Sequence, residues 1–377
     1  MSAETNISDL NRATARRWIA EGREIALATL VDIEGSAPLD PGAMMLIDAD
    51  GNVEGSVTGG CVEGALVAEA QLVLGGESPR VRTYGISDDQ AVGVGLMCGG
   101  TVRVFVERLD EPATEAVDRV LAAALEGRPA ALATLLDGPS AGHRMTNVGS
   151  ITDGSMRTVE LLDHTVTREM EGMLAQGITQ LRRYGSDGAA MGSDLRVHIQ
   201  SFAERPQMVI FGAIDFSVAV AALAGAIGYR VTIVDAREAF LRSPRFTDVA
   251  EVAVDWPDRF LEARELGARD AVLVFTHDPK FDEPALIGAL GSGAGYVGAL
   301  GSRRTHRQRV ERLLEAGVSE AEIARIAAPC GLDIGARTPA ETAVSVLAEV
   351  ITLQNARSAE RLAESQGPIH SHRVPVP

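Results

Sequence analysis

Two different patterns of apolar and polar residues divide the chain near residues 203–206. Before this point, short strand-like runs are mixed with single amphipathic helices and a hairpin signal, in which the turn at 49–52 joins strands at 44–48 and 53–57. After it, apolar runs that start at Gln207 alternate regularly with amphipathic helices. Such alternation is typical of a parallel, doubly wound sheet. We therefore predict an α/β protein with an N-terminal α+β domain and a C-terminal Rossmann-like domain.

The N-terminal half repeats itself. The run 25–31 resembles 130–136, Arg82-Thr83-Tyr84-Gly85 resembles Arg182-Arg183-Tyr184-Gly185, and the stretch at 55–61 resembles 149–155. Similar pieces in the same order indicate two copies of one structural unit. This alignment places Cys61 on Ser155 and Cys98 on Met191, so only the first copy keeps its thiols.

These patterns give the expected domain boundaries. We predict one domain over 1–203, with copies at about 1–110 and 111–203, and a Rossmann-like domain over 204–365. The polar, proline-rich segment 366–377 is expected to be a flexible tail.

The composition limits which partners and which cellular compartment we expect for this protein. The 377 residues carry a formal net charge of −17, which argues against nucleic acid or an anionic membrane as a partner. No run is long enough to span a membrane, and the N-terminus lacks an apolar signal core. Three widely spaced cysteines without a CxxC motif fit a reduced cytoplasm and no structural metal site.

The strongest chemical candidate is Cys61, which follows Gly59-Gly60 at a predicted strand-to-helix transition. Glycines let a ligand approach the backbone, and a helix N-terminus favours a thiolate. Together with Cys98, which precedes Gly99-Gly100, it could hold a soft ligand such as sulfur, a thiolate-binding metal or a dithiolene. The alternative is a small apolar residue in a tight turn, which is also our interpretation of Cys330.

The first turn of the Rossmann-like domain is unusual. A dinucleotide fold needs G-x-G-x-x-G, but Gly212 is followed by Ile214 at the second glycine position and by Ser217 at the third. Asp235 keeps the position that would bind a ribose. We therefore do not expect NAD(P) to bind in its usual pose.

Two later strand ends form better candidate sites. His277 and Asp278 follow one predicted strand, and Ser302, Arg303 and Arg304 follow the next and begin a helix. Cations at a helix N-terminus oppose the helix dipole, so this placement favours a bound anion such as a phosphate.

These motifs together resemble the XdhC/CoxI family of accessory proteins for molybdenum hydroxylases such as xanthine dehydrogenase. The resemblance covers roughly residues 10–110 and 205–355. The matching stretches are Gly35-Ser36-Ala37-Pro38, Gly59-Gly60-Cys61-Val62-Glu63, Cys98-Gly99-Gly100, Phe105-Val106-Glu107, His277-Asp278, Gly298-Ala299-Leu300-Gly301-Ser302-Arg303-Arg304, Gly331-Leu332-Asp333-Ile334-Gly335-Ala336 and Thr338-Pro339.

The resemblance implies a chaperone that binds the molybdopterin form of the molybdenum cofactor, protects it during sulfuration by a sulfurtransferase and hands it to an apo molybdenum hydroxylase. The cofactor-binding residues would then be Gly59, Gly60, Cys61, Glu63, Cys98, Gly99, Gly100, His277, Asp278, Ser302, Arg303 and Arg304. We assign no catalytic residue and no metal ligand, because the chain offers no obvious acid/base pair or triad.

Two alternatives remain open: a NAD(P)-dependent oxidoreductase that uses the C-terminal domain, and a cofactor-free regulatory paralogue. We also expect a homodimer, since symmetric association commonly closes sites that are shared between domains.

Overall fold

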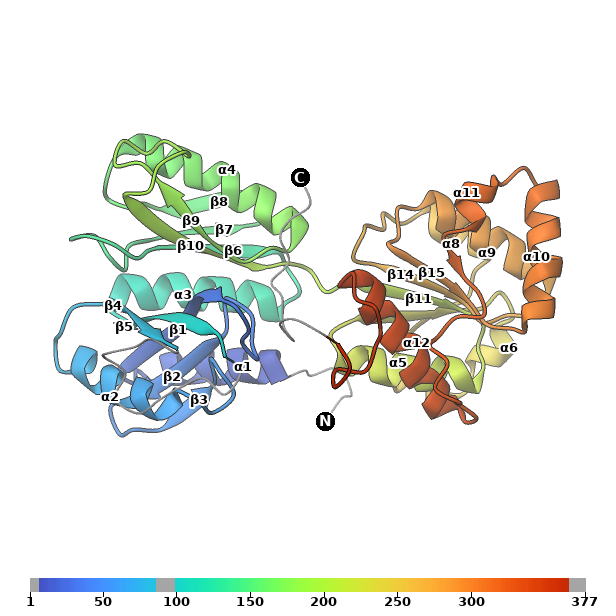
Figure 1. The fold of residues 1–377 in the computed structure, drawn as a ribbon, viewed down its shortest axis with the longest axis horizontal. Helices are drawn as coiled ribbons and strands as arrows, with labels where there is room; N and C mark the ends of the chain where they lie inside the picture. The colour runs from blue at the N-terminus through green and yellow to red at the C-terminus, as the bar shows by residue number, and fades with distance from the viewer. Residues whose placement is uncertain (1–6, 86–98, 366–377) are drawn as a thin grey trace. The chain divides into compact units, whose positions relative to one another are not determined.

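The computed structural model describes residues 7–85 and 99–365. Within these ranges the chain forms two compact units, Ile7–Glu204 and Arg205–Ser365 (Figure 1). Each unit has its own hydrophobic clusters, and each is described separately below.

The N-terminal unit contains two antiparallel sheets of the same topology. The first has the order β3-β2-β1-β5-β4 and the second the order β8-β7-β6-β10-β9. The strands of the first are β1 (Ile25–Glu34), β2 (Met44–Asp48), β3 (Val53–Gly55), β4 (Arg80–Tyr84) and β5 (Thr101–Arg108). Those of the second are β6 (Ala130–Leu135), β7 (Arg144–Val148), β8 (Ile151–Gly154), β9 (Gln180–Tyr184) and β10 (Leu195–Phe202).

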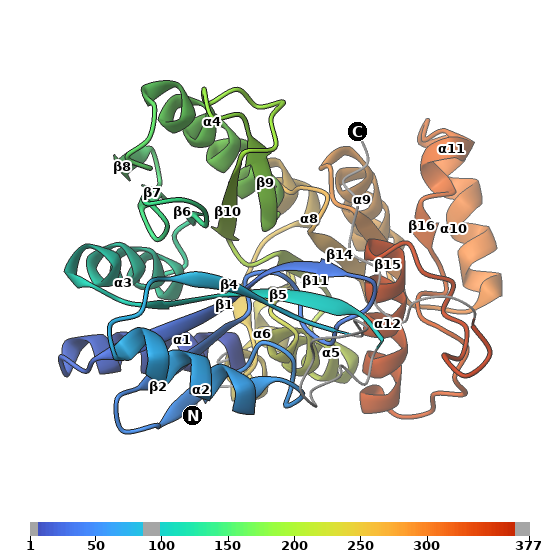
Figure 2. The ribbon, with the colours of Figure 1, turned by 60° about the vertical axis from the view of Figure 1, so that its left-hand side comes forward.

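Four helices cover these sheets. Helix α2 (Glu63–Leu74) packs on β1 and β5, and α4 (Glu160–Gln176) packs on β6 and β10, so each lies on its own sheet (Figure 2). Helices α1 (Ile7–Ala20) and α3 (Glu111–Leu125) pack against each other. Their apolar side chains join Leu27 of β1 and Leu132 of β6 in one buried cluster, which ties the two copies together.

The internal duplication that the sequence predicts is therefore present, but one part of its residue alignment is wrong. Gly55 pairs with Met45, and its counterpart Gly154 pairs with Met145. Both glycines have positive φ, and a Cβ on either would collide with the backbone of the preceding strand. Hence Gly55 corresponds to Gly154, not to Gly149, which lies in the turn between β7 and β8.

This register changes the counterpart of Cys61. Arg82 pairs with Glu69 and Arg182 with Glu169, which aligns α2 with α4 at a spacing of 100 residues. Cys61 therefore corresponds to Leu161, while Ser155 corresponds to Ser56. Elsewhere the spacing between equivalent residues differs. Thr29 pairs with Met44, and its counterpart Thr134 pairs with Arg144, so the spacing between Thr29 and Thr134 is 105 residues. The alignment failed because copy two has shorter loops at several places, which no single offset can represent. Cys98 lies outside the described residues.

The C-terminal unit is a parallel sheet between two layers of helices, as predicted. Its strand order is β13-β12-β11-β14-β15-β16, with every pair parallel. The strands are β11 (Gln207–Phe211), β12 (Arg230–Val234), β13 (Glu251–Ala253), β14 (Ala271–Val274), β15 (Tyr296–Ala299) and β16 (Ile326–Ala327). The chain turns back after β11 to place β12 and β14 on its two sides, which is where such sheets bind ligands.

Alternate residues of these strands face opposite helical layers. Met208 and Ile210 join the cluster of α5 (Asp215–Ala226) and α12 (Pro339–Gln354), whereas Val209 and Phe211 join that of α8 (Pro257–Glu262), α9 (Pro279–Gly291) and α10 (Arg303–Glu315) (Figure 1). Short helices α6 (Glu238–Leu241), α7 (Pro244–Thr247) and α11 (Glu320–Ile323) complete the unit. Helix α12 begins with a capping box formed by Thr338 and Glu341.

Candidate functional site

The loop that carries Cys61 connects β3 to α2 and is organised by the carboxylate of Glu63. This carboxylate accepts hydrogen bonds from the hydroxyls of Ser56 and Thr58 and from the backbone N–H groups of residues 57, 58, 60 and 62. Although burial raises the pKa of Glu63, the bonds from Ser56 and Thr58 outweigh it and hold this pKa at about 2. Glu63 thus fixes the loop as a permanently charged acceptor.

The loop leaves its glycines and its thiol accessible. Gly59 and Gly60 have φ values of 75° and 120°, and the space next to both α-carbons is open. A side chain there would be strained, so glycine is required by the backbone and leaves room for a ligand. Cys61 is a partly buried free cysteine that packs against the core of copy one.

The other predicted residues of this site are only partly described. Cys98 lies outside the described residues. Gly99 has positive φ, and Gly100 lies so close to the backbone of Ser36 that any side chain would collide with it. The motif Gly35-Ser36 and the pair Gly99-Gly100 are thus brought together, where the end of β1 lies beside the start of β5.

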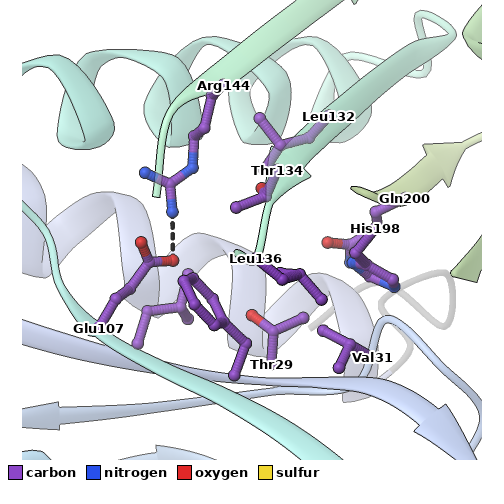
Figure 3. Close-up of a pocket in the computed structure, with 11 residues that line it drawn as sticks. Thr29, Val31, Glu107, Leu132, Thr134, Leu136, Arg144, His198 and Gln200 are labelled. Atoms are coloured by element: carbon purple, nitrogen blue, oxygen red, sulfur yellow. Dashed lines mark hydrogen bonds and ion pairs between the residues drawn. The ribbon is translucent and has the colours of Figure 1, made fainter. Parts of the chain in front are cut away.

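Between the two sheets lies a buried polar cluster that the sequence analysis missed (Figure 3). Arg144 of copy two donates to Glu107 of copy one, and both side chains are buried. At the pseudo-symmetric position, Gln200 of copy two donates to the backbone oxygen of Gly42, 2.8 Å away. His198, the counterpart of Phe105, lines the same cavity.

This cavity does not have the size of a cofactor site. Its volume of about 10 Å³ suits about one water molecule. Burial lowers the pKa of His198 to about 4, so the imidazole is neutral near pH 7. The cluster therefore joins the two copies and is not where a large ligand would bind. The sequence signal was an arginine and a histidine inside otherwise buried strands.

In the C-terminal unit, the predicted anion-binding residues lie at the carboxyl ends of two neighbouring strands. His277 and Asp278 follow β14, and Ser302, Arg303 and Arg304 follow β15. Asp278 caps α9 and pairs with Lys280, at 3.2 Å. Ser302 caps α10. Arg303 and Arg304 are exposed and make no ion pair with any residue in the described ranges.

A second buried group supports these two strand ends. Arg309 of α10 donates to Asp282 of α9, at 2.8 Å, and to the backbone oxygen of Leu300, at 3.3 Å. Asp282 also accepts from the hydroxyl of Thr276. This group fixes the end of β14 to the end of β15 through buried, charge-assisted hydrogen bonds.

The first Rossmann turn differs from a dinucleotide site in the hydrogen bonds of its acidic residue, Asp235, as well as in its missing glycines. The Asp235 carboxylate accepts from the backbone N–H of Ala213, at 3.0 Å, and from both the backbone and the guanidinium of Arg237. Burial raises the pKa of Asp235, but the bonds from Arg237 and Ala213 outweigh it and lower this pKa. The acid expected to bind a ribose is thus engaged within the protein.

The remaining candidate residue, Cys330, does not belong to a site. Cys330 is buried in the core, as predicted, and burial raises the pKa of its thiol to about 12. In residues 7–85 and 99–365 there is no group of three or more His, Cys, Asp or Glu side chains that could hold a metal ion. In the same ranges, no helix has the length and apolar character that crossing a membrane needs.

The sequence and the fold both match known proteins. Residues 18–85 match the family model of the XdhC and CoxI family, and residues 208–350 match that of the XdhC Rossmann domain. A protein of Bacillus subtilis named as a probable subunit of xanthine dehydrogenase is 26% identical over 88% of this chain and 94% of its own length. The "Molybdenum cofactor insertion chaperone PaoD" of Escherichia coli is 28% identical over 89% of this chain and 85% of its own.

A solved structure shares the whole architecture. The crystal structure of a protein from Bacillus halodurans, described as a xanthine dehydrogenase, superposes with a TM-score of 0.68 and 25% identity. The match covers 94% of this chain and 98% of that one.

Proposed function

Because this chain belongs to the XdhC and CoxI family, we propose that it binds the molybdenum cofactor as cargo and delivers it to a molybdenum enzyme of the xanthine dehydrogenase type. The relative described as a molybdenum cofactor insertion chaperone supports this role. We further propose that the cargo is the molybdopterin form, that it is sulfurated by a partner sulfurtransferase while bound, and that the protein acts as a homodimer.

The observation that carries the proposal is the loop of Gly59, Gly60 and Cys61. Its glycines leave the backbone open, its thiol is free and partly accessible, and Glu63 holds it rigidly. A thiolate is a soft ligand that suits a metal bound by sulfur. The loop could therefore contact the molybdenum end of the cofactor, and Glu63 acts by positioning the loop.

We expect Cys61→Ser to abolish cofactor retention while leaving the fold intact. Serine is close to cysteine in size but replaces the soft sulfur ligand by a hard hydroxyl oxygen. Molybdenum content per chain, measured after purification from a cofactor-competent host, should fall to background, and the circular dichroism spectrum should not change.

The matched controls are Leu161→Ala, at the structural counterpart of Cys61, and Ser155→Ala. Both lie in copy two and should retain molybdenum like the wild type. Equal molybdenum in the wild type and in Cys61→Ser would contradict the proposal that copy one holds the cofactor.

For the C-terminal unit by itself, we propose a phosphate-binding site at the carboxyl ends of β14 and β15. Arg303 and Arg304 offer two exposed guanidiniums next to the capping hydroxyl of Ser302, and His277 and Asp278 lie at the adjacent strand end. Each guanidinium–phosphate contact contributes about 1.5–3 kcal/mol.

Replacing Arg303 and Arg304 with alanine should therefore weaken the affinity for a phosphorylated pterin by at least tenfold, measured by calorimetry. Arg307→Ala is the control, because it removes another exposed cation one turn further along α10. An equal loss in the control would indicate a general charge effect and not a phosphate site.

The two alternative functions have less support. An oxidoreductase that binds NAD(P) in the usual pose would need Asp235 for the ribose, and this carboxylate is bound to Ala213 and Arg237. A cofactor-free regulatory paralogue would not need an accessible thiol in an open glycine loop. That NAD(P) does not bind stays a prediction.

A further inference from the structure

The exposed aromatic side chains of this protein gather at one place. The chain has 2 tryptophans, 4 tyrosines and 9 phenylalanines, all within the described ranges. Only Phe240 and Trp256 are exposed, at 49% and 40% of their surface. Phe240 lies in α6, after β12, and Trp256 directly precedes α8, after β13, so both follow the carboxyl ends of neighbouring strands.

These two rings belong to a continuous stack. The guanidinium carbon of Arg237 lies 4.1 Å from the ring centre of Phe240 and 5.4 Å from that of Phe281. The rings of Phe281 and Trp256 are 5.1 Å apart, with their planes at 44°. Arg237 and Phe281 thus lie between the two exposed rings and support both of them.

Asp235 fixes the centre of this stack. Its two oxygens accept from Nε and Nη2 of Arg237, at 2.9 and 2.8 Å, and the backbone N–H of Ala213 holds the carboxylate itself. Asp235 and Arg237 are residue types that bind a ribose or a phosphate in other proteins of this fold. Here they hold each other, and the guanidinium lies over the rings of Phe240 and Phe281. Holding large apolar rings in contact with water is costly, and a ring-shaped ligand would cover them.

We propose that Phe240, Trp256 and the stack between them bind a flat heteroaromatic ring system, either a pterin or a nucleobase. The chemistry is the same for both sources, because aromatic side chains stack on any such ring without reading its edge. None of the residues of the stack belongs to the Cys61 loop or to the phosphate-binding residues at the ends of β14 and β15, so the inference goes beyond the proposed function.

The test uses the full chain and three uncharged probes, neopterin, adenosine and cytidine, titrated by calorimetry. At least one probe should bind the wild type. Trp256→Leu and Phe240→Leu keep an apolar side chain but remove the ring, so each should weaken binding by about 5- to 150-fold. Trp256→Phe and Phe240→Tyr keep a ring and should stay within about threefold of the wild type, because stacking needs only a π face.

Ile287→Ala is the control, because Ile287 is an exposed apolar side chain of α9 outside the stack. It should bind the probes like the wild type. Tighter binding of neopterin identifies a pterin site, and tighter binding of a nucleoside identifies a nucleobase site. Absence of binding by all three probes, or equal binding by the leucine variants, overturns the proposal. Cys61→Ser should bind the probes normally, so a failure of the cofactor proposal would be seen separately.

Discussion

At the scale of single residues, His198 shows how the two copies have diverged inside a shared interface. It occupies the place that Phe105 has in copy one, and its buried imidazole has a pKa of about 4. The unfolded chain has the ordinary histidine pKa near 6.5, so it binds more protons than the folded chain between these values. Stability should therefore fall as the pH drops through this window, by about 2 kcal/mol between pH 7 and pH 5.

His198→Phe should remove this part of the pH dependence, because phenylalanine copies the residue of the other half and cannot take up a proton. The measurement is the free energy of unfolding in urea at pH 7 and pH 5, compared between variant and wild type. Glu107 lines the same cavity and is present in both proteins, so its titration cancels. His164→Ala, at an exposed histidine, should leave the dependence unchanged. The idea fails if His198→Phe retains the full wild-type slope.

The sequence could not predict the clusters that these residues form. Arg144 and Glu107 belong to different copies, and the stack of Phe240, Arg237 and Trp256 depends on where three strand ends meet. Each of these residues is ordinary in its local sequence. Only contacts made across the fold distinguish them.

At the scale of elements, the loop that precedes the helix α2 or α4 is held by different numbers of hydrogen bonds in the two copies. Glu63 accepts six hydrogen bonds in copy one, whereas its counterpart Asp163 accepts one from the backbone of Met156, at 2.9 Å. Glu63→Gln should cost roughly 1–3 kcal/mol in the free energy of unfolding, because the amide replaces an acceptor oxygen with a donor facing N–H groups.

Asp163→Asn is the matched control and should cost less than about 1 kcal/mol. The effect of Glu63→Gln also has a defined pH dependence. The pKa of Glu63 is depressed to about 2, so its contribution is present above the ordinary value near 4.5 and is lost as the pH falls towards 2. Equal costs for the two substitutions at pH 7 would show that the hydrogen bonds of Glu63 do not stabilise the loop.

The helices and strands could be predicted from the sequence, but the residue-by-residue correspondence of the two copies could be predicted only in part. Repeated sequence pieces predicted the duplicated unit. Hydrophobic patterning predicted the strands and the parallel sheet, because burial on one or both faces determines which residues are apolar. The alignment of Cys61 with Ser155 was wrong because glycine and serine are common in turns, so a short match there carries little information. The ion pairs of Glu69 and Glu169 with the neighbouring strands would have given the correct register.

At the scale of the whole molecule, we expect two cooperative units and not three. The C-terminal unit has its own sheet and two buried clusters. The two copies of the N-terminal unit share a cluster that includes Leu27 and Leu132, and the ion pair of Glu107 with Arg144 crosses between them. Separating the copies would expose the apolar side chains of that cluster to water and break the ion pair.

Three fragments test this division: residues 1–204, 205–377 and 1–110. The first two should each show a single cooperative urea transition by circular dichroism, because each keeps its own core intact. The third should lack one, since the apolar face of β1 and the carboxylate of Glu107 would lie open to water. The intact chain is the reference for both transitions. A cooperative transition in 1–110 would show that a single copy folds by itself, and the absence of one in 205–377 would show that the C-terminal unit does not.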